Sequence, residues 1–446
     1  MAHVDQFGVA LSAGDAVAVR HYDAAVAQLL TFDAAVLAEA GRAVAVDRSL
    51  VMGHVLLGLL YSLGTENSQR PDARAALEAA RAVAGVLPRE QLHLAAIAAW
   101  LRGDFTGACG HWEEILVEQP NDALAMFAAH QADFLLGRSS ELRDRVARRL
   151  PELDQGSALE GHYFGMYAFG LEEMGDYGRA AAFGRRAVER CRRDAWAIHA
   201  VAHVFEMTNR VHDGRDWLTQ RAGDWSGGSF LAVHHWWHLA LLYADQQDWP
   251  RVLSIYDEHM HRDGATVMEL LDASALLWRL KLYDVDTGDR WQPLADAWEP
   301  RAGDAWYAFN DVHAMMAFAG AGRGDAARRL LGALEAAANS STANGAVSRD
   351  IGLPVATALL AYAEGRFAAA VDRLLPVRAL AGAAGGSHAQ RDVLAQTVLS
   401  AAEKSGRTRL ARALLNERLE LKPHSTLNRL WFERLAAGTH RVGGSA

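Results

Sequence analysis

Apolar residues recur along the chain with the period of an α-helix, and short polar breaks separate the helical runs. In three clear copies a run ends in Gly, a polar residue and an aromatic residue, with Ala five places after the Gly: Gly103-Asp104-Phe105 with Ala108, Gly175-Asp176-Tyr177 with Ala180, and Gly365-Arg366-Phe367 with Ala370. The residues 11, 8, 7 and 4 places before each Gly are apolar or small, and these offsets share one helical face. The pattern predicts helical hairpins of the tetratricopeptide type.

Weaker copies of this break fill the rest of the chain, at Gly64, Gly137, Asn209, Gln247, near Gly322 to Gly324, at Gly406, and in a longer turn around Asp286-Thr287-Gly288. Helix pairs that bury a face only against their neighbours stack into a superhelix with a concave surface. We therefore expect an all-α fold: a right-handed α-solenoid of about nine or ten pairs.

The same breaks predict how this single solenoid, 1–446, is organised. An N-terminal helical cap is expected at 1–48, N-terminal repeats with a His-rich inner face at 49–265, C-terminal repeats at 266–435, and a disordered tail at 436–446.

Composition agrees with long helices and excludes several classes of protein. Hydrophobic residues make up 51% of the chain and there are only 10 Pro, so few helices are interrupted. The net charge of −9 is spread along the chain without a basic, aromatic-rich stripe, which argues against nucleic acid as a partner. The two Cys cannot build a disulfide framework, and no stretch has the length and apolarity of a signal peptide or membrane span. We expect a cytoplasmic protein without membrane contact.

Polar side chains recur at fixed offsets before the turns. His54, His93 and His199 each lie ten residues before a turn, and His234 lies thirteen before Gln247. Offsets of 13, 10, 6 and 3 fall on one helical face, apart from the packing face. Because equivalent positions on stacked helices face the same groove, we expect these side chains to meet on the concave surface.

Two His-x-x-x-His pairs point to specific chemistry. They are His199/His203, followed on the same face by Glu206, and His234/His238. Such a pair with a carboxylate from the next turn can hold a divalent metal such as zinc, which predicts His199, His203 and Glu206 as ligands. The Glu that follows the first His of a metalloprotease helix is missing, so that class is disfavoured.

Proton transfer is the alternative use of the same residues, because imidazole titrates near neutral pH. On this reading the catalytic residues are His199, His203, His234 and His238, with Glu206 orienting an imidazole. A third interpretation is that the histidines are hydrogen-bonded parts of the core.

Two later stretches could supply contacts to a substrate. Asp311 and His313 lie at the head of one predicted helix, and Arg391 and Asp392 follow a Gly-Gly-Ser sequence that opens another. No phosphate-binding loop, dinucleotide fingerprint or nucleophile elbow occurs. The predicted substrate-binding set is His54, His93, Trp237, Asp311, His313, Arg391 and Asp392.

Taken together, these residues resemble the tetratricopeptide-repeat protein 38 family, from about Val51 to Pro423. The resemblance rests on Arg89 to His93, Asp194 to Ala197, His199 to His203 with Glu206-Met207, His234 with Trp237-His238, Asp272 with Ser274, Asp289-Arg290-Trp291, Phe309-Asn310-Asp311 with His313, Gly352-Leu353-Pro354, and Gly385-Gly386-Ser387 with Ala389 to Asp392. It implies a tetratricopeptide-like superhelix and no particular activity. His162, His235 and His388 depart from the family pattern and inherit nothing from it.

The leading hypothesis is a concave pocket of His, Glu and Asp that binds a small polar molecule and could perform acid–base chemistry of a hydrolase or lyase type. Tetratricopeptide grooves that bind peptides usually offer Lys, Arg and Asn, whereas this one offers His and Glu. The alternatives are a non-catalytic scaffold for a protein or peptide partner and a divalent-metal-dependent enzyme.

Overall fold

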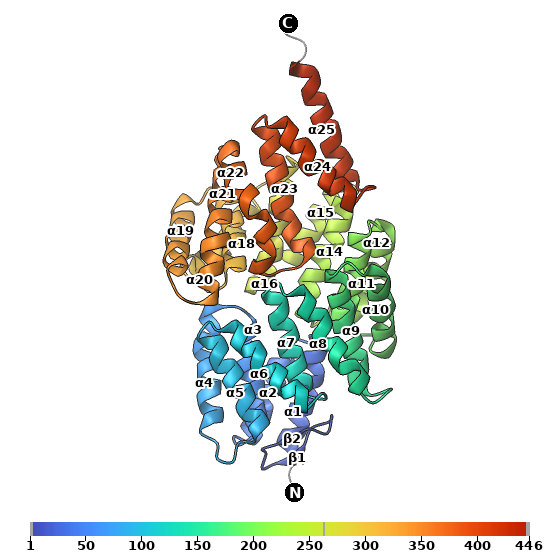
Figure 1. Ribbon diagram of the computed structural model, residues 1–446, viewed down its shortest axis with the longest axis vertical. Helices are drawn as coiled ribbons and strands as arrows, with labels where there is room; N and C mark the ends of the chain where they lie inside the picture. The colour runs from blue at the N-terminus through green and yellow to red at the C-terminus, as the bar shows by residue number, and fades with distance from the viewer. Residues whose placement is uncertain (1–2, 262–263, 443–446) are drawn as a thin grey trace. The chain divides into compact units, whose positions relative to one another are not determined.

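The computed structural model describes residues 3–261 and 264–442, and almost all of its regular structure is α-helical (Figure 1). The chain divides into two compact units. The first comprises the chain up to Val201 together with Arg221–Ala232, and the second comprises Ala202–Gln220 together with the chain from Val233 onward. The predicted fold class, an all-α solenoid of helical hairpins, is confirmed.

The first unit begins with a short antiparallel ribbon, after which helices follow one another in sequence. Its elements are β1 (His3–Val4), β2 (Ala10–Leu11), α1 (Ala16–Leu30), α2 (Val36–Val46), α3 (Val51–Leu63), α4 (Arg70–Arg81), α5 (Pro88–Leu101), α6 (Phe105–Glu118), α7 (Ala123–Leu135), α8 (Ser139–Arg149), α9 (Ala158–Glu173), α10 (Tyr177–Arg190), the start of α11 (Ala195–Met207), and α13 (Ala222–Trp225).

The second unit continues the same pattern of hairpins. Its elements are the remainder of α11, α12 (Val211–Gln220), α14 (Ala232–Ala244), α15 (Trp249–Ile255), α16 (Val267–Leu282), α17 (Trp291–Trp298), α18 (Ala308–Ala321), α19 (Gly324–Ala338), α20 (Ala343–Val347), α21 (Leu353–Ala363), α22 (Phe367–Val377), α23 (His388–Lys404), α24 (Thr408–Leu421) and α25 (Thr426–Val442). Single π-helical turns lie at Tyr256–Met260 and Ser348–Gly352, and short 3₁₀ segments occur in both units.

One backbone hydrogen bond defines the turns inside the hairpins. In ten turns of the described chain, a residue with positive φ follows the first helix, and the N–H of the next residue donates to a carbonyl five residues back. The positive-φ residues are Phe32, Gly103, Gly137, Gly175, Asn209, Gln247, Asp284, Gly322, Gly365 and Gly406. This bond is that of the Schellman motif, which satisfies a carbonyl left open at the helix end. The predicted breaks are therefore helix stops, with Asp284 taking the positive φ in the longer turn.

Two details of these turns refine the sequence prediction. At the break near Gly64, Gly64 itself is right-handed with φ −62°, and Thr65 takes the positive φ of 56°. In the Gly103 and Gly175 turns, Asp104 and Asp176 cap the following helix, each accepting a hydrogen bond from a backbone N–H in its first turn.

The elements differ from those predicted at the two ends of the chain. The N-terminal cap is not wholly helical, because β1 and β2 precede α1, and strands of two residues are too short to give an alternating pattern. The two compact units exchange segments of the chain between residues 201 and 233, and the predicted change from N-terminal to C-terminal repeats near residue 265 stays a prediction. The predicted disordered tail at 436–446 is corrected for residues 436–442, which continue α25; residues 443–446 lie outside the described residues.

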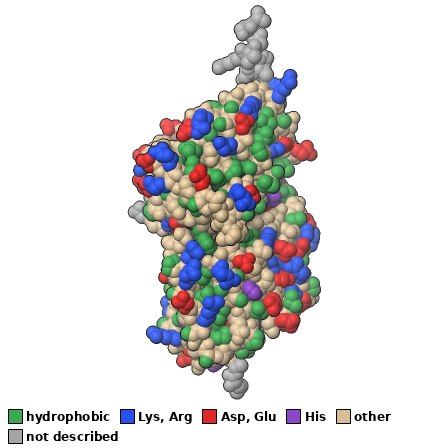
Figure 2. Space-filling model, turned by 60° about the vertical axis from the view of Figure 1, so that its left-hand side comes forward, with side chains coloured by type: hydrophobic (Ala, Val, Ile, Leu, Met, Phe, Trp, Pro, Cys, Tyr) green, Lys and Arg blue, Asp and Glu red, His purple; other side chains and the backbone are tan. Residues whose placement is uncertain are grey.

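Hydropathy and surface charge also bear on partners. Among the residues that the structure describes, no helix combines the length and apolarity needed to cross a bilayer. On the face drawn in Figure 2, Lys and Arg side chains are interspersed with Asp and Glu, so this face carries no continuous basic stripe.

Candidate functional site

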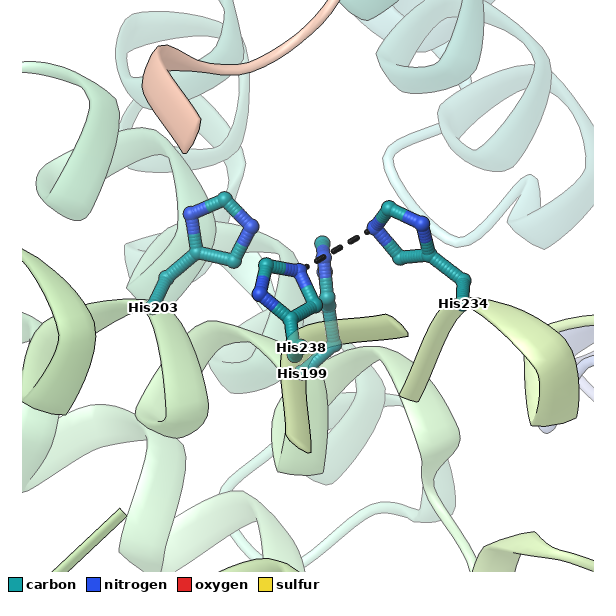
Figure 3. Close-up of side chains that lie close together, drawn as sticks. All are labelled: His199, His203, His234 and His238. Carbon is teal, nitrogen blue, oxygen red and sulfur yellow. Dashed lines mark hydrogen bonds between the residues drawn. The ribbon is translucent and has the colours of Figure 1, made fainter. Parts of the chain in front are cut away.

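Four buried histidines from α11 and α14 come together (Figure 3). His199 and His203 lie one turn apart on α11, and His234 and His238 lie one turn apart on α14. One ring nitrogen of each lies within 4.8 Å of the others, a spacing that could hold a metal ion. His203, His234 and His238 belong to the second unit, and His199 is held relative to His203 by the continuous helix α11.

Two carboxylates orient the α14 histidines. Nδ1 of His234 lies 2.9 Å from Oδ2 of Asp272 on α16, and Nδ1 of His238 lies 2.9 Å from Oε2 of Glu206 on α11. Hydrogen bonds from one ring nitrogen to a carboxylate fix the tautomer and the orientation of a metal-binding imidazole. Both rings therefore present Nε2.

The two Nε2 atoms face each other at 3.2 Å, the contact dashed in Figure 3. When Nδ1 carries the proton that a carboxylate accepts, Nε2 of a neutral imidazole carries a lone pair. Two lone pairs at this distance repel unless a cation, either a proton or a metal ion, lies between them. Two imidazoles on a tetrahedral zinc ion, with bonds of about 2.0–2.1 Å, place their nitrogens about 3.3 Å apart, so the observed spacing matches a pair of metal ligands.

The surroundings favour the neutral form of His238. Burial, together with His203, His234, His235 and Arg279, holds the pKa of His238 well below its usual range. The His203 ring lies 4.5 Å from that of His238, centre to centre, and Trp237 stacks on His234 at 5.2 Å. Neutral imidazole is the form that binds metals.

A small cavity of about 50 Å³ adjoins this cluster within the second unit. Glu206, which holds His238, lines it, and so do Arg279 of α16 and Asp392 of α23. Arg279 also lies over the face of Trp237, with its guanidinium carbon 5.2 Å from the ring centre. The cavity is therefore separated from the histidines by a single layer of side chains.

The structure places one residue of the sequence-predicted metal set apart from the other two. His199 and His203 belong to the four-histidine group, but Glu206 does not. Its carboxylate contacts Nδ1 of His238, on the side of the ring away from the other histidines. The third and fourth nitrogens come from His234 and His238, which had been assigned to catalysis alone. The i,i+4 spacing identifies the pairs correctly, but which side chain faces which depends on how α11 packs against α14.

The predicted substrate-binding residues are divided between places. Trp237 packs against His234 and His238, and Asp392 lines the cavity, where Arg418 holds the pKa of this buried carboxyl well below its usual range in spite of the burial. His54 and His93 lie in the first unit with partners of their own. Nε2 of His54 is 3.0 Å from the carbonyl of Arg48, and Nε2 of His93 is 3.1 Å from Asp122.

Asp311, His313 and Arg391 lie away from the Arg279 cavity lining. His313 and Arg391 line a second cavity of about 10 Å³, and Nδ1 of His313 donates to the carbonyl of Phe309. Burial raises the pKa of Asp311 to about 8, with Asp304 adding to the rise. Asp311 is therefore a neutral carboxyl near pH 7.

Sequence reasoning missed two residues of this region, Asp272 and Arg279, as site residues. They stand seven positions apart on α16 and so share one face of that helix. Asp272 offered a signal, because it is the one charged residue between Leu270 and Trp278 and a buried charge needs a partner. Arg279 offered none, because it lies in the last turn of α16, where a basic residue is expected.

Comparisons with known proteins add little to the fold. No protein-family model matches the chain. Among solved structures, a chain of the structure of Naa15/Naa10 bound to HypK-THB is similar to it, with 15% sequence identity and a TM-score of 0.28 over 92% of this chain. This chain spans 59% of the length of that one. The helical-hairpin fold is therefore established by the helices themselves, and membership of the tetratricopeptide-repeat protein 38 family stays a prediction.

Proposed function

We propose that this tetratricopeptide-like protein is a divalent-metal-dependent enzyme that acts on a small polar molecule, with His203, His234 and His238 as the metal ligands. One observation carries the proposal: the Nε2 atoms of His234 and His238 converge at 3.2 Å while Asp272 and Glu206 hold their Nδ1 atoms. Core histidines need only one partner each, and packing alone gives no reason for two carboxylate-oriented rings to converge.

Three histidine ligands leave one position of a tetrahedral ion open, as in catalytic zinc sites. A divalent ion there would polarise a carbonyl oxygen or lower the pKa of a bound water, which supplies the nucleophile for hydrolysis. The chain's own contribution is to fix the rings through Glu206 and Asp272 and to bury them. The acid–base interpretation is weaker, because the nitrogens needed for proton transfer at His234 and His238 contact each other.

A second candidate follows from the fourth histidine. If His199 binds as well, the site is closed with four nitrogens, as structural zinc sites are. The chain is then a non-catalytic scaffold for a protein or peptide, stabilised by its metal.

The metal content of protein purified without a His-tag tests the proposal. We expect about one transition-metal ion per chain in the wild type, and its loss in His234→Gln. The control is His162→Gln, because His162 also pairs through Nδ1 with a carboxylate, Asp194, outside the cluster. A wild-type protein that binds no metal when dialysed against Zn²⁺ or Co²⁺ contradicts both candidates.

The absorption spectrum of the Co²⁺-loaded protein separates the two candidates. An open site exchanges its fourth ligand, so azide should change the visible bands. A spectrum that azide leaves unchanged, in a tetrahedral site that also needs His199, favours the scaffold.

A further inference from the structure

The cavity beside the histidine cluster is lined by charged side chains, and one of its cations has no carboxylate of the described chain within ion-pair distance. Six charged residues line it: three cations, Arg279, Arg418 and Lys422, and three acids, Glu206, Asp245 and Asp392. All six belong to the second unit. Its volume of about 50 Å³ exceeds what one water needs, about 10–15 Å³ on the same measure, so a group of a few atoms fits.

Two of the cations have acidic partners. Arg418 binds Asp392 through both Nη atoms, with Nη2 3.2 Å from Oδ2, and Gln396 donates to the same carboxylate at 2.6 Å. The ammonium of Lys422 lies 3.8 Å from Oε1 of Glu206.

The remaining acid is held by hydroxyls. Asp245 accepts a hydrogen bond from Ser425 through its side chain and one from Thr426 through its backbone carbonyl. Burial raises the pKa of Asp245, which disfavours its ionised form. Asp245 is engaged by these hydroxyls and lies beyond ion-pair distance of the third cation.

Arg279 is that third cation. Its side chain is only 5% exposed, and its guanidinium donates to the backbone carbonyls of Ala275 at 3.2 Å and Ala389 at 2.6 Å. No carboxylate of the described residues lies within ion-pair distance of it. A buried charge without a counter-ion is costly. A guanidinium kept in this state at the wall of a cavity is suited to an anion from outside the chain.

We infer that the cavity binds the carboxylate group of a small organic acid, with Arg279 as its counter-ion. The planar guanidinium matches a carboxylate in shape and can donate to both of its oxygens. Phosphate fits less well, because a dianion would leave one charge unbalanced beside Glu206 and Asp392.

Because this cavity lies beside the histidines, small organic acids are the substrate class that we infer for the metal centre. This part of the inference rests on the proposed function. Glu206 lines the cavity and holds Nδ1 of His238, and Arg279 lies over Trp237, which stacks on His234. An acid anchored at Arg279 is thus one layer of side chains from the histidines.

Binding of acetate, formate and inorganic phosphate to the full chain, measured by calorimetry in a buffer free of carboxylates, tests the inference. The metal-free protein, prepared by chelation, is measured first. A failure of carboxylate binding can then be distinguished from a failure of metal binding. We expect acetate or formate to bind the wild type, and to bind Arg279→Gln at least tenfold more weakly. The control is Arg215→Gln, which should bind with unchanged affinity, because Arg215 is a half-buried arginine of the same unit that does not line the cavity.

Ala244→Leu keeps every charge and tests the cavity if Arg279→Gln fails to fold. Ala244 lines the cavity, so a larger side chain there should block acetate. The inference is overturned if the wild type binds neither acetate nor formate, if phosphate binds more tightly than both, or if Ala244→Leu binds acetate as the wild type does.

The link to the metal centre has its own readout. In Co²⁺-loaded protein, the carbon signal of ¹³C-labelled acetate should relax faster than with Zn²⁺. Equal relaxation, with acetate bound, would leave the carboxylate site standing and overturn its role as a substrate site.

Discussion

The two units use the same histidine–carboxylate pair for different ends. In the first unit, His93 contacts Asp122, and the same carboxylate also binds Arg89 and caps α7 through the N–H of Ala125. In the second unit, the pairs His234–Asp272 and His238–Glu206 turn their other nitrogens toward each other. The pair is thus a structural unit in one place and, on the proposed function, half of a metal-ligand set in the other. The difference is that the second ring nitrogens of His234 and His238 converge on each other. A single histidine–carboxylate pair, taken alone, does not show whether this happens.

Metal removal should have the largest effect and should separate the units. A ligand at a thousand times its dissociation constant stabilises the folded state by about 4 kcal/mol, so chelation should cost the second unit an amount of this order. Hydrogen exchange of loaded and chelated protein should show the loss in α14 and α16. Equal loss of protection across α3 to α8 would contradict the assignment of the site to the second unit.

Asp122→Asn should produce the next largest effect, in the first unit. It leaves Arg89 without its buried counter-ion, for which we expect a loss of about 3 kcal/mol in the free energy of unfolding. Burial raises the pKa of Asp122, but His93, Arg89 and the N–H of Ala125 outweigh it and hold the pKa well below its usual range.

The sign of its pH dependence follows from that shift. Because the folded-state pKa is lower than the unfolded one, this stability is present above about pH 4 and is lost as the pH falls below it. Urea unfolding at pH 7 and pH 3 measures both. Metal content should not change, and a loss of metal in Asp122→Asn would show that the units do not differ in the way described.

Asp272→Asn should weaken metal binding without unfolding the chain. Partners that orient a metal-binding histidine typically contribute about 10–100-fold in affinity, and we expect a loss in this range. A competition titration against a chromophoric chelator measures it. The matched control is Asp194→Asn, which breaks the His162 pair in the first unit and should leave the affinity unchanged. An unchanged affinity in Asp272→Asn would assign His234 to the core.

Asp311→Asn gives the smallest effect and the opposite pH dependence from Asp122. The pKa of Asp311 is raised by burial from 3.8 to about 8, so the folded state keeps a proton that the unfolded state has released. Wild-type stability therefore falls as the pH rises between these values, by up to about 1.4 kcal/mol per pH unit. The variant lacks this titration, and its advantage over the wild type should grow by about that amount between pH 6 and pH 7. A difference that stays constant over this range would show that Asp311 is ionised in the folded state.

The helical hairpins could be predicted from the sequence because the residues that define them lie close together in the chain. Gly103, Gly175 and Gly365 mark turns in which each helix end is completed by atoms a few residues away. The His-x-x-x-His pairs are local in the same sense, since one turn of helix fixes their spacing.

The rest of the candidate site is not local. Asp272 meets His234 across 38 positions, and the guanidinium of Arg279 meets the carbonyl of Ala389 across 110. Glu206 was expected to bind a metal because it follows His203 on one face, yet its carboxylate contacts His238 on α14. Such contacts depend on how the helices pack against one another. A single sequence does not show which residues of two distant helices meet.

The bond that closes the ten turns has a consequence for how such a chain can change over time. It joins two backbone atoms, and the only demand on the side chain is tolerance of a positive φ, met here by Gly, Asn, Gln, Asp and Phe. A mutation at the turn can therefore reduce the sequence similarity between two repeats while leaving the hairpin intact. If the repeats arose by duplication, their common origin would remain detectable in the backbone structure after the sequence similarity has been lost.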